Sequence, residues 1–397
     1  MVTIDKIFHA SVVLKDIIRP TPLAKAYGIA EDCKLYLKPE CLQKTGSFKL
    51  RGSGYKIAML SEEEKARGVI ACSAGNHAQG VALAASKCGI SSLICLPDTA
   101  PISKVEATKG YGAQVCLVPG VYDDAYNRAL ELKEERGYTF VHPFDDEYVI
   151  SGQGTIGLEI MNEMSDMDAV IVPIGGGGLI SGVACAIKSI SPHVKVYGVQ
   201  AAGAPSMFNA VNHGHMEALE KVSTIADGIA VKKPGEITYE MVKNYVDDIA
   251  LVTEDEIAAA ILALIEKQKM IAEGAGAVSV AAAMFHKFPI EGKKVVSLIS
   301  GGNIDVTSLS RVIDRGLMKS GRTTNLLIEL VDKPGQLMDV SRIIAQCGGN
   351  VIAVHHERNG ETESINGCYL RLTLETRNYD HVQEITQALK DAGFKIV

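Results

Sequence analysis

Three cationic side chains, Lys44, Lys49 and Arg51, lie close together in the stretch PECLQKTGSFKLRGS, residues 39–53. A lysine is either an ordinary solvated charge or, as a free amine, a nucleophile toward a carbonyl group. Lys49 is the better candidate for a nucleophile, because a Thr-Gly-Ser turn just before it can start a helix. The positive end of that helix and partial burial beside the neighbouring phenylalanine would both disfavour the ammonium form. Lys44 precedes the turn, so we expect it to be solvated.

A tetraglycine segment is the second chemical feature, in IGGGGLISG at residues 174–182. Glycines let the backbone approach a phosphate closely and point several N–H groups at it. The segment lacks the Lys-Ser/Thr pair of a nucleoside-triphosphate loop and the GxGxxG spacing of a dinucleotide site. A plain tight turn is the alternative, but four consecutive glycines cost too much chain entropy to favour it. The segment therefore predicts a site for a single phosphate.

Two further glycine segments follow apolar strands, ACSAGNHAQG at 71–80 and SLISGGNID at 297–305. The first also reads as a βα turn with a serine cap, and alone that is the better interpretation. In open parallel sheets, however, ligands sit at the carboxyl ends of strands, where all three glycine segments lie. One phosphate-bearing ligand could touch them all. Together with a lysine that reacts with aldehydes, this ligand would be pyridoxal phosphate.

A long α/β alternation positions these residues. Helical patterns cover 76–88, 121–136, 179–190 and 254–270, and short apolar strands between helices predict parallel sheets covered on both faces. The predicted strands are 69–72, 92–96, 114–118, 169–174, 195–200, 249–252 and 294–300.

The pattern changes at a polar, glycine-containing junction over 315–323, so we place a domain boundary near 318. The remaining residues, 323–397, predict the order βαββαβ of a ferredoxin-like fold. The catalytic part would be residues 1–318, with a smaller subdomain at roughly 48–150.

Composition narrows the class of protein. The chain has 397 residues and a net charge of −7, with no basic block, so we expect neither a nucleic acid nor a membrane as partner. Nine scattered cysteines without a CxxC pair indicate reduced thiols in a cytoplasmic protein, and no signal peptide is visible. The histidines show no metal-ligand spacing; His355 and His356 would face opposite sides of one strand. We therefore predict no metal site.

The motifs KTGSFKLRG, SAGNHAQG, GGGGL and SGGN, in this order, closely resemble the fold-type II pyridoxal-phosphate enzymes, over roughly residues 5–315. The nearest branch is that of threonine dehydratase (threonine ammonia-lyase) and serine racemase. LVDKPGQL at 330–337 and GGNVIAVHHER at 348–358 resemble one ACT domain. The resemblance implies a lyase of cytoplasmic amino-acid metabolism, in isoleucine biosynthesis, with two open parallel-sheet subdomains and an ACT domain.

The resemblance also implies site residues. Lys49 would form a Schiff base with the cofactor and act as the base at the substrate Cα, Phe48 would flank the ring, and Asn76 would bind its 3-hydroxyl oxygen. Glu273 would line the ring, although a helix cap is an equal alternative. The cofactor residues would be Phe48, Lys49, Asn76, Gly175, Gly176, Gly177, Gly178, Leu179 and Ser300. The substrate carboxylate would bind Ser73, Ala74, Gly75, Asn76 and His77.

Ser300, which would meet the pyridine nitrogen, bears on the reaction. A serine there leaves that nitrogen unprotonated, so loss of the β-hydroxyl is favoured over a long-lived carbanion. Serine racemase carries a second serine where this chain has Ala74, and two metal-binding carboxylates in the region where this chain has Gln200 and Ser206. We therefore expect deamination of L-threonine to 2-oxobutanoate and ammonia, with L-serine as a secondary substrate.

Three alternatives stay open: a serine dehydratase or racemase, a β-replacing synthase for cysteine or cystathionine, and a non-catalytic amino-acid sensor.

The resemblance to an ACT domain implies allosteric control by isoleucine or valine and a homodimer or homotetramer. Free N–H groups at Pro334-Gly335 and Gly349-Asn350 would hold the effector. A stabilising or dimerising module is the simpler interpretation of these C-terminal residues.

Overall fold

The computed structural model describes residues 1–358 and 367–397. They form two compact units, Met1–Asp305 and Val306–Val397. None of the described helices combines the length and apolar character needed to cross a membrane. All nine cysteines are free thiols.

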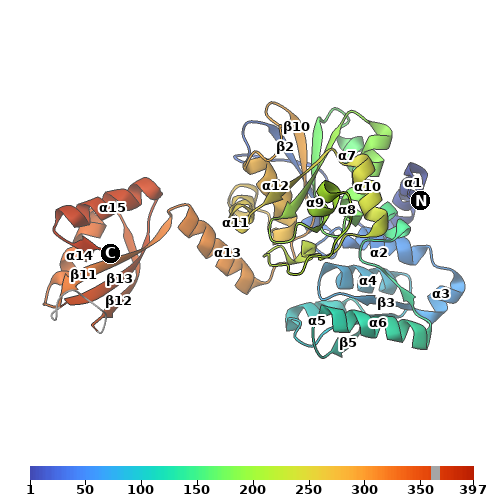
Figure 1. The fold of residues 1–397 in the computed structure, drawn as a ribbon, viewed down its shortest axis with the longest axis horizontal. Coiled ribbons are helices and arrows are strands. Elements are labelled where there is room, and N and C mark those ends of the chain that lie inside the picture. The colour runs from blue at the N-terminus through green and yellow to red at the C-terminus, as the bar shows by residue number, and fades with distance from the viewer. Residues whose placement is uncertain (359–366) are drawn as a thin grey trace. The chain divides into compact units, whose positions relative to one another are not determined.

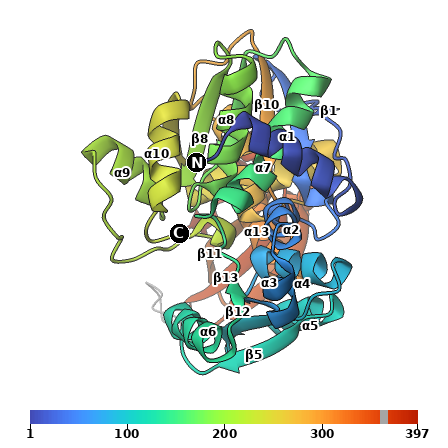
Figure 2. The same cartoon turned by 90° about the vertical axis from the view of Figure 1, so that its right-hand side faces the viewer.

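The first unit contains two sheets (Figures 1 and 2). The strands of the larger sheet are β1 (Ala24–Lys25), β2 (Lys34–Pro39), β7 (Ala169–Pro173), β8 (Lys195–Ala201), β9 (Asp248–Val252) and β10 (Lys294–Ile299). Those of the smaller sheet are β3 (Val69–Cys72), β4 (Ser92–Pro97), β5 (Gln114–Val118) and β6 (Thr139–Phe140). The orders are β1-β2-β10-β7-β8-β9 and β5-β4-β3-β6. All pairings are parallel except that of β1 with β2, which confirms the predicted parallel sheets.

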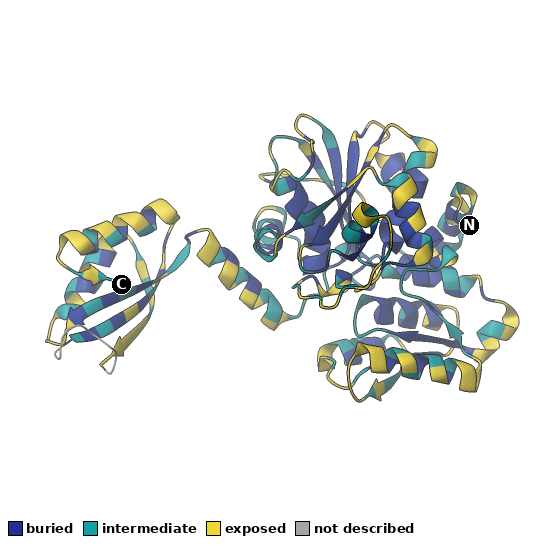
Figure 3. Ribbon diagram, in the orientation of Figure 1, coloured by how far each residue is buried: buried dark blue, intermediate teal, exposed yellow. Residues whose placement is uncertain are grey.

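Helices cover these sheets and leave their strands in the interior (Figure 3). In the smaller sheet, Val69 and Ala71 pack into one apolar cluster with the helix after β3, and Ile70 and Cys72 pack into another with the helix after β5. Burial on both faces explains why the strand is wholly apolar. The helices are α1 (Ile4–Val13), α2 (Lys49–Ala58), α3 (Glu62–Arg67), α4 (Asn76–Lys87), α5 (Ile102–Gly110), α6 (Tyr122–Arg136), α7 (Glu147–Glu163), α8 (Gly178–Ile190), α9 (Ser206–His213), α10 (Glu236–Tyr245), α11 (Glu254–Ala263) and α12 (Gly274–Met284).

One predicted helix is wrong in its extent. The apolar pattern predicted a helix over 254–270, but α11 ends at Ala263 and a π-helical turn covers Leu264–Gln268. Lys269 then adopts a left-handed conformation with φ of 58°, which stops the helix. A single π-turn spans too few residues to leave a period of its own in the sequence, so the apolar pattern does not predict it.

The second unit contains a four-stranded antiparallel sheet. Its elements are α13 (Val306–Lys319), β11 (Thr323–Val331), α14 (Gln336–Gln346), β12 (Asn350–Glu357), β13 (Gly367–Glu375), α15 (Tyr379–Asp391) and β14 (Lys395–Ile396). The strand order is β12-β13-β11-β14, and α14 packs against α15. The predicted order βαββαβ is confirmed. Helix α13 runs through part of the expected junction, because Leu309, Val312, Ile313 and Leu317 repeat at helical spacing.

Candidate active site

Lys49 is the first residue of α2, and the end of β10 holds that helix start. The Phe48 N–H donates to the Ser300 carbonyl oxygen at 3.0 Å, and Ser47 forms a bridge with Gly301. These bonds bring two predicted site residues, Phe48 and Ser300, next to each other although they are far apart in sequence. The junction of α2 with β10 therefore places the lysine at a strand's carboxyl end.

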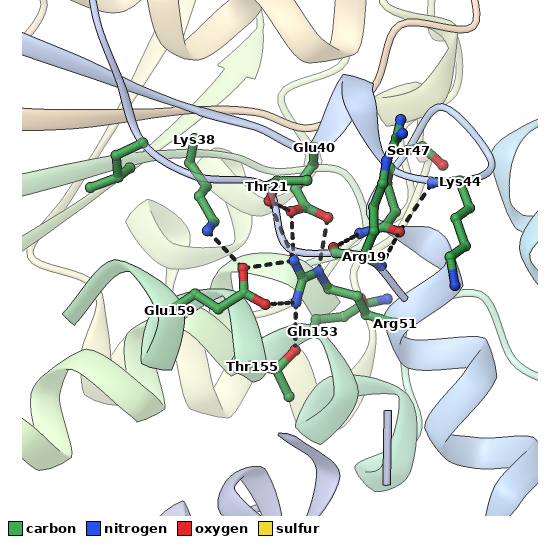
Figure 4. A network of polar contacts seen from close by, with 12 residues as sticks. Arg19, Thr21, Lys38, Glu40, Lys44, Ser47, Arg51, Gln153, Thr155 and Glu159 are labelled. Carbon is green, nitrogen blue, oxygen red and sulfur yellow. Dashed lines mark hydrogen bonds and ion pairs between the residues drawn. The ribbon is translucent and has the colours of Figure 1, made fainter. Parts of the chain in front are cut away.

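Arg51 fixes the same helix from the other side (Figure 4). Its guanidinium group is fully buried and binds Glu40 at 2.8 Å, Glu159 at 2.6 Å and the hydroxyl of Thr155 at 3.1 Å. Glu159 also pairs with the buried Lys38 at 2.7 Å. A guanidinium group with two carboxylates satisfies its donors in a fixed plane. The network ties α2 to the end of β2 and to α7, so the third cation of the opening stretch has a structural role.

The two lysines have different surroundings. Lys44 is exposed, as expected, and its Nζ donates to the Ile17 carbonyl oxygen at 2.8 Å. Lys49 Nζ donates to the Pro143 carbonyl oxygen at 2.7 Å and forms no ion pair with a described carboxylate. Burial lowers the pKa of Lys49 to about 8, and the negative charge of Glu273 opposes this shift in part. A useful fraction of this side chain is therefore a free amine near neutral pH.

The tetraglycine turn closes around the residue that follows Pro143. A Cβ added to Gly176 would lie 2.4 Å from the Phe144 ring, and one added to Gly178 would lie 2.7 Å from the Phe144 carbonyl oxygen. Gly177 has φ of +98°, a conformation that other residues rarely adopt. The turn therefore requires glycine for both space and conformation. Because Lys49 contacts Pro143, the lysine and the turn meet at one short segment.

A chain of polar side chains joins the other two glycine segments. Asn76 Nδ2 donates to Glu273 Oε1 at 2.6 Å, and Asn303 Nδ2 donates to Asn76 Oδ1 at 2.8 Å and to the Thr45 carbonyl oxygen at 2.8 Å. Burial and the nearby Asp227 charge raise the pKa of Glu273 to about 7. The sequence alone does not decide between a ring contact and a helix cap for Glu273, and it predicts no role for Asn303, although the SGGN motif contains this residue.

The remaining predicted residues lie at the start of α4 and the end of β10. Ser300 is buried, and its hydroxyl donates to the Ala275 carbonyl oxygen at 3.1 Å. In the 73–77 turn, a Cβ on Gly75 would meet nothing within 4 Å, so space is open there. His77 is buried against the Val141 carbonyl oxygen at 2.8 Å, and burial lowers its pKa to about 3. It is therefore neutral and unsuited to accept a proton.

Gln200 and Ser206 lie in the region that the resemblance matches to the metal-binding carboxylates of serine racemase. Both are buried, and Gln200 Nε2 and Ser206 Oγ have no hydrogen-bond partner among the described residues. Gln200 Oε1 accepts the Phe208 N–H at 2.8 Å. Neither side chain carries the negative charge of a carboxylate, and an amide N–H group does not ligate a metal ion.

A lysine with a lowered pKa, a turn of backbone N–H groups that admits no side chain and a buried neutral serine fit a phosphate-bearing aldehyde. This combination, on two parallel sheets, defines a pyridoxal-phosphate enzyme of fold type II. The comparison with known families agrees, since the profile of the pyridoxal-phosphate dependent enzymes matches residues 14–301. The chain belongs to that family, and its cofactor is pyridoxal phosphate, as predicted.

Individual relatives are similar over most of their length. The chain is 50% identical to an L-threonine ammonia-lyase of Thermotoga maritima, over all of this chain and 99% of the relative. A solved threonine deaminase isoform of Solanum lycopersicum is 39% identical with a TM-score of 0.74, covering 78% of this chain and 93% of that one. The solved structure of maize serine racemase is 35% identical with a TM-score of 0.75, and the match covers 80% of this chain and 98% of the racemase chain.

Proposed function

We propose that the protein is an ammonia-lyase that converts L-threonine to 2-oxobutanoate and ammonia and accepts L-serine less well. The observation that carries the proposal is the meeting of Lys49 and the tetraglycine turn at Pro143 and Phe144. The identity of half the residues with a protein called L-threonine ammonia-lyase supports the choice of substrate.

The cofactor would be held by groups from all three glycine segments. The N–H groups of residues 175–179 would bind the phosphate, because glycines let the backbone approach a phosphate closely. Phe48 would pack on the ring, Asn76 would donate to its 3-hydroxyl oxygen, and the Ser300 hydroxyl would meet the pyridine nitrogen. Asn303 and Glu273 hold the Asn76 side chain from both ends, so its orientation is set before any ligand arrives.

Pyridoxal phosphate, when bound, withdraws electrons from the Cα of an amino acid and makes its proton acidic. Lys49 Nζ would accept that proton, since its pKa of about 8 is close to the working range of a general base. The open turn at residues 73–77, at the N-terminus of α4, would bind the substrate carboxylate. The hydroxyl leaves as water and hydrolysis later consumes one water, so the net products are 2-oxobutanoate and ammonia.

Ala74 favours the lyase over the racemase. Inversion at Cα requires a second group that delivers a proton to the opposite face of the substrate. A methyl side chain at position 74 carries no proton, and the buried, neutral His77 contacts a backbone carbonyl instead. We therefore propose that racemisation is a minor activity.

For the C-terminal residues 323–397 we propose an ACT domain that pairs with a second copy and binds isoleucine or valine near Pro334 and Gly335. The order βαββαβ and the turn before α14 support this assignment. Catalysis would then reside in residues 1–318. Titration of the full-length enzyme with each amino acid during turnover tests the proposal; an enzyme indifferent to both would contradict it.

The catalytic proposal is tested by measuring 2-oxobutanoate and ammonia formed from L-threonine. Lys49→Ala should lose activity and the visible absorption of the bound cofactor, whereas the matched Lys44→Ala should keep both. An enzyme that releases neither product from L-threonine, or a Lys49→Ala variant that turns over normally, would overturn the assignment.

A further inference from the structure

Three side chains of metal-ligating types, two from strands and one from the turn after a third strand, meet at one end of the C-terminal sheet. Asp332 follows β11, His356 lies in β12, and Cys368 is the second residue of β13. The ligand atoms they offer lie within 4.8 Å of one another, and His356 Nε2 is 3.0 Å from Cys368 Sγ. The register explains the meeting: His356 pairs with Leu370, two residues beyond Cys368, so both side chains lie on one face of the sheet.

Thiolate, imidazole and carboxylate are ligands that zinc accepts together. At metal–ligand distances of about 2.0–2.3 Å, neighbouring atoms around a tetrahedral ion lie roughly 3–4 Å apart. His356 and Cys368 already have this spacing, and the exposed Asp332 side chain can rotate to close the remainder. We propose that the C-terminal unit binds a zinc-class divalent cation through Asp332, His356 and Cys368, with the fourth position open.

The present partners of these side chains do not prevent binding. Asp332 pairs with Arg358 at 3.1 Å, but the Arg358 side chain is 68% exposed and that of Asp332 36%, so this surface ion pair is easily exchanged. Magnesium and calcium are disfavoured because one ligand is sulfur. Zinc binds the thiolate form of a cysteine, so binding at Cys368 releases a proton.

The position of the site suggests what the cation would do. Asp332 stands three residues before Gly335, the left-handed residue that caps α14. A metal bond to Asp332 would fix the turn between β11 and α14 against β12 and β13. This inference concerns the C-terminal unit alone and does not depend on the deamination reaction.

The test uses the full-length holoenzyme, reduced and freed of metal by a chelator. Zinc affinity is measured by competition with a chromophoric chelator, and cobalt is used as a spectroscopic probe whose ligand-field bands lie to the red of the cofactor absorption. His356→Ala should weaken zinc binding by at least about tenfold and abolish the cobalt bands of a tetrahedral site. Cys368→Ser should do the same.

Two neighbouring variants serve as controls. His355→Ala changes the adjacent histidine, which pairs with Arg371 on the other face of the sheet, and Cys347→Ser changes a cysteine outside the cluster. Both should bind zinc and cobalt like the unmodified enzyme. If Cys368→Ser fails to fold, the His356→Ala variant still tests the proposal, because His356 is exposed and its replacement should not disturb folding. An unmodified enzyme without cobalt bands, or equal zinc affinity in His356→Ala and His355→Ala, would overturn the proposal.

Discussion

Replacing Glu273 by glutamine should stabilise the cofactor-free protein in alkaline solution and have little effect in acid. The carboxyl group is buried, and its pKa is raised from 4.5 to about 7, chiefly by burial. Glutamine keeps the oxygen that accepts the Asn76 N–H but never ionises. The substitution therefore removes the cost of a buried charge and leaves the hydrogen bond in place.

The sign and size follow from proton linkage. Between pH 4.5 and 7 the folded protein holds a proton on Glu273 that the unfolded chain has lost, so folding stability falls as pH rises through this window. The raised pKa of Glu273 lowers the free energy of unfolding by about 1 kcal/mol at pH 5 and by about 3 kcal/mol at pH 8, because one pKa unit corresponds to about 1.4 kcal/mol. The gain in unfolding free energy of Glu273→Gln should therefore be larger at pH 8 by roughly 2 kcal/mol.

Urea unfolding followed by circular dichroism at both pH values measures this difference; the chain has no tryptophan for fluorescence. Glu291→Gln is the matched control, because Glu291 is exposed. Its effect on the free energy of unfolding should be the same at both pH values. If the gain from Glu273→Gln were the same at pH 5 and pH 8, the carboxyl group would be ionised in the folded protein at both pH values. The argument that burial raises its pKa would then be refuted.

Three other substitutions test the site. Gly176→Ala would set a methyl carbon 2.4 Å from the Phe144 ring, so it should weaken pyridoxal phosphate binding by about tenfold or more, as measured by equilibrium dialysis. The control variant Gly110→Ala, whose added methyl group would meet nothing within 4 Å, should bind the cofactor normally. Arg51→Met leaves Glu40 buried without its cation and should lower the free energy of unfolding by about 3–5 kcal/mol in urea; a loss under 1 kcal/mol would contradict the role of the network. Ala74→Ser should increase D-serine formation from L-serine, measured by chiral chromatography, and no increase would contradict the role given to this position.

The sheets of the first unit could be predicted because their strands are short, apolar and separated by helices. The strand Val69–Cys72 is buried on both faces, and a wholly apolar strand of this kind is typical of the interior of a parallel sheet covered by helices. The glycine turn could be predicted for a related reason, since four glycines make sense only where a side chain has no room. At Gly176 and Gly178 the structure supplies the atoms that leave no room.

Polar partners across the chain could not be predicted. Asn303 reaches Asn76 across 227 residues, and the cluster of Asp332, His356 and Cys368 draws on three strands. Such contacts depend on strand register and on side-chain rotamers, and neither of these produces a recognisable spacing of residues in the sequence. The two histidines at 355 and 356 show the difference: the sequence gives their opposite faces, but only the fold shows that a cysteine lies beside one of them.

The three cations of residues 44–51 show how surroundings decide what a charge does. Lys44, in solvent, contacts backbone carbonyls and needs no partner. Arg51 is fully buried and must stay charged, which a guanidinium group does, so two carboxylates surround it. Lys49 is partly buried and forms no ion pair with a described carboxylate, and a primary amine in that position can release its proton. Exchanging the residue types at 49 and 51 would therefore give an amine that cannot hold two carboxylates and a cation that cannot act as a base.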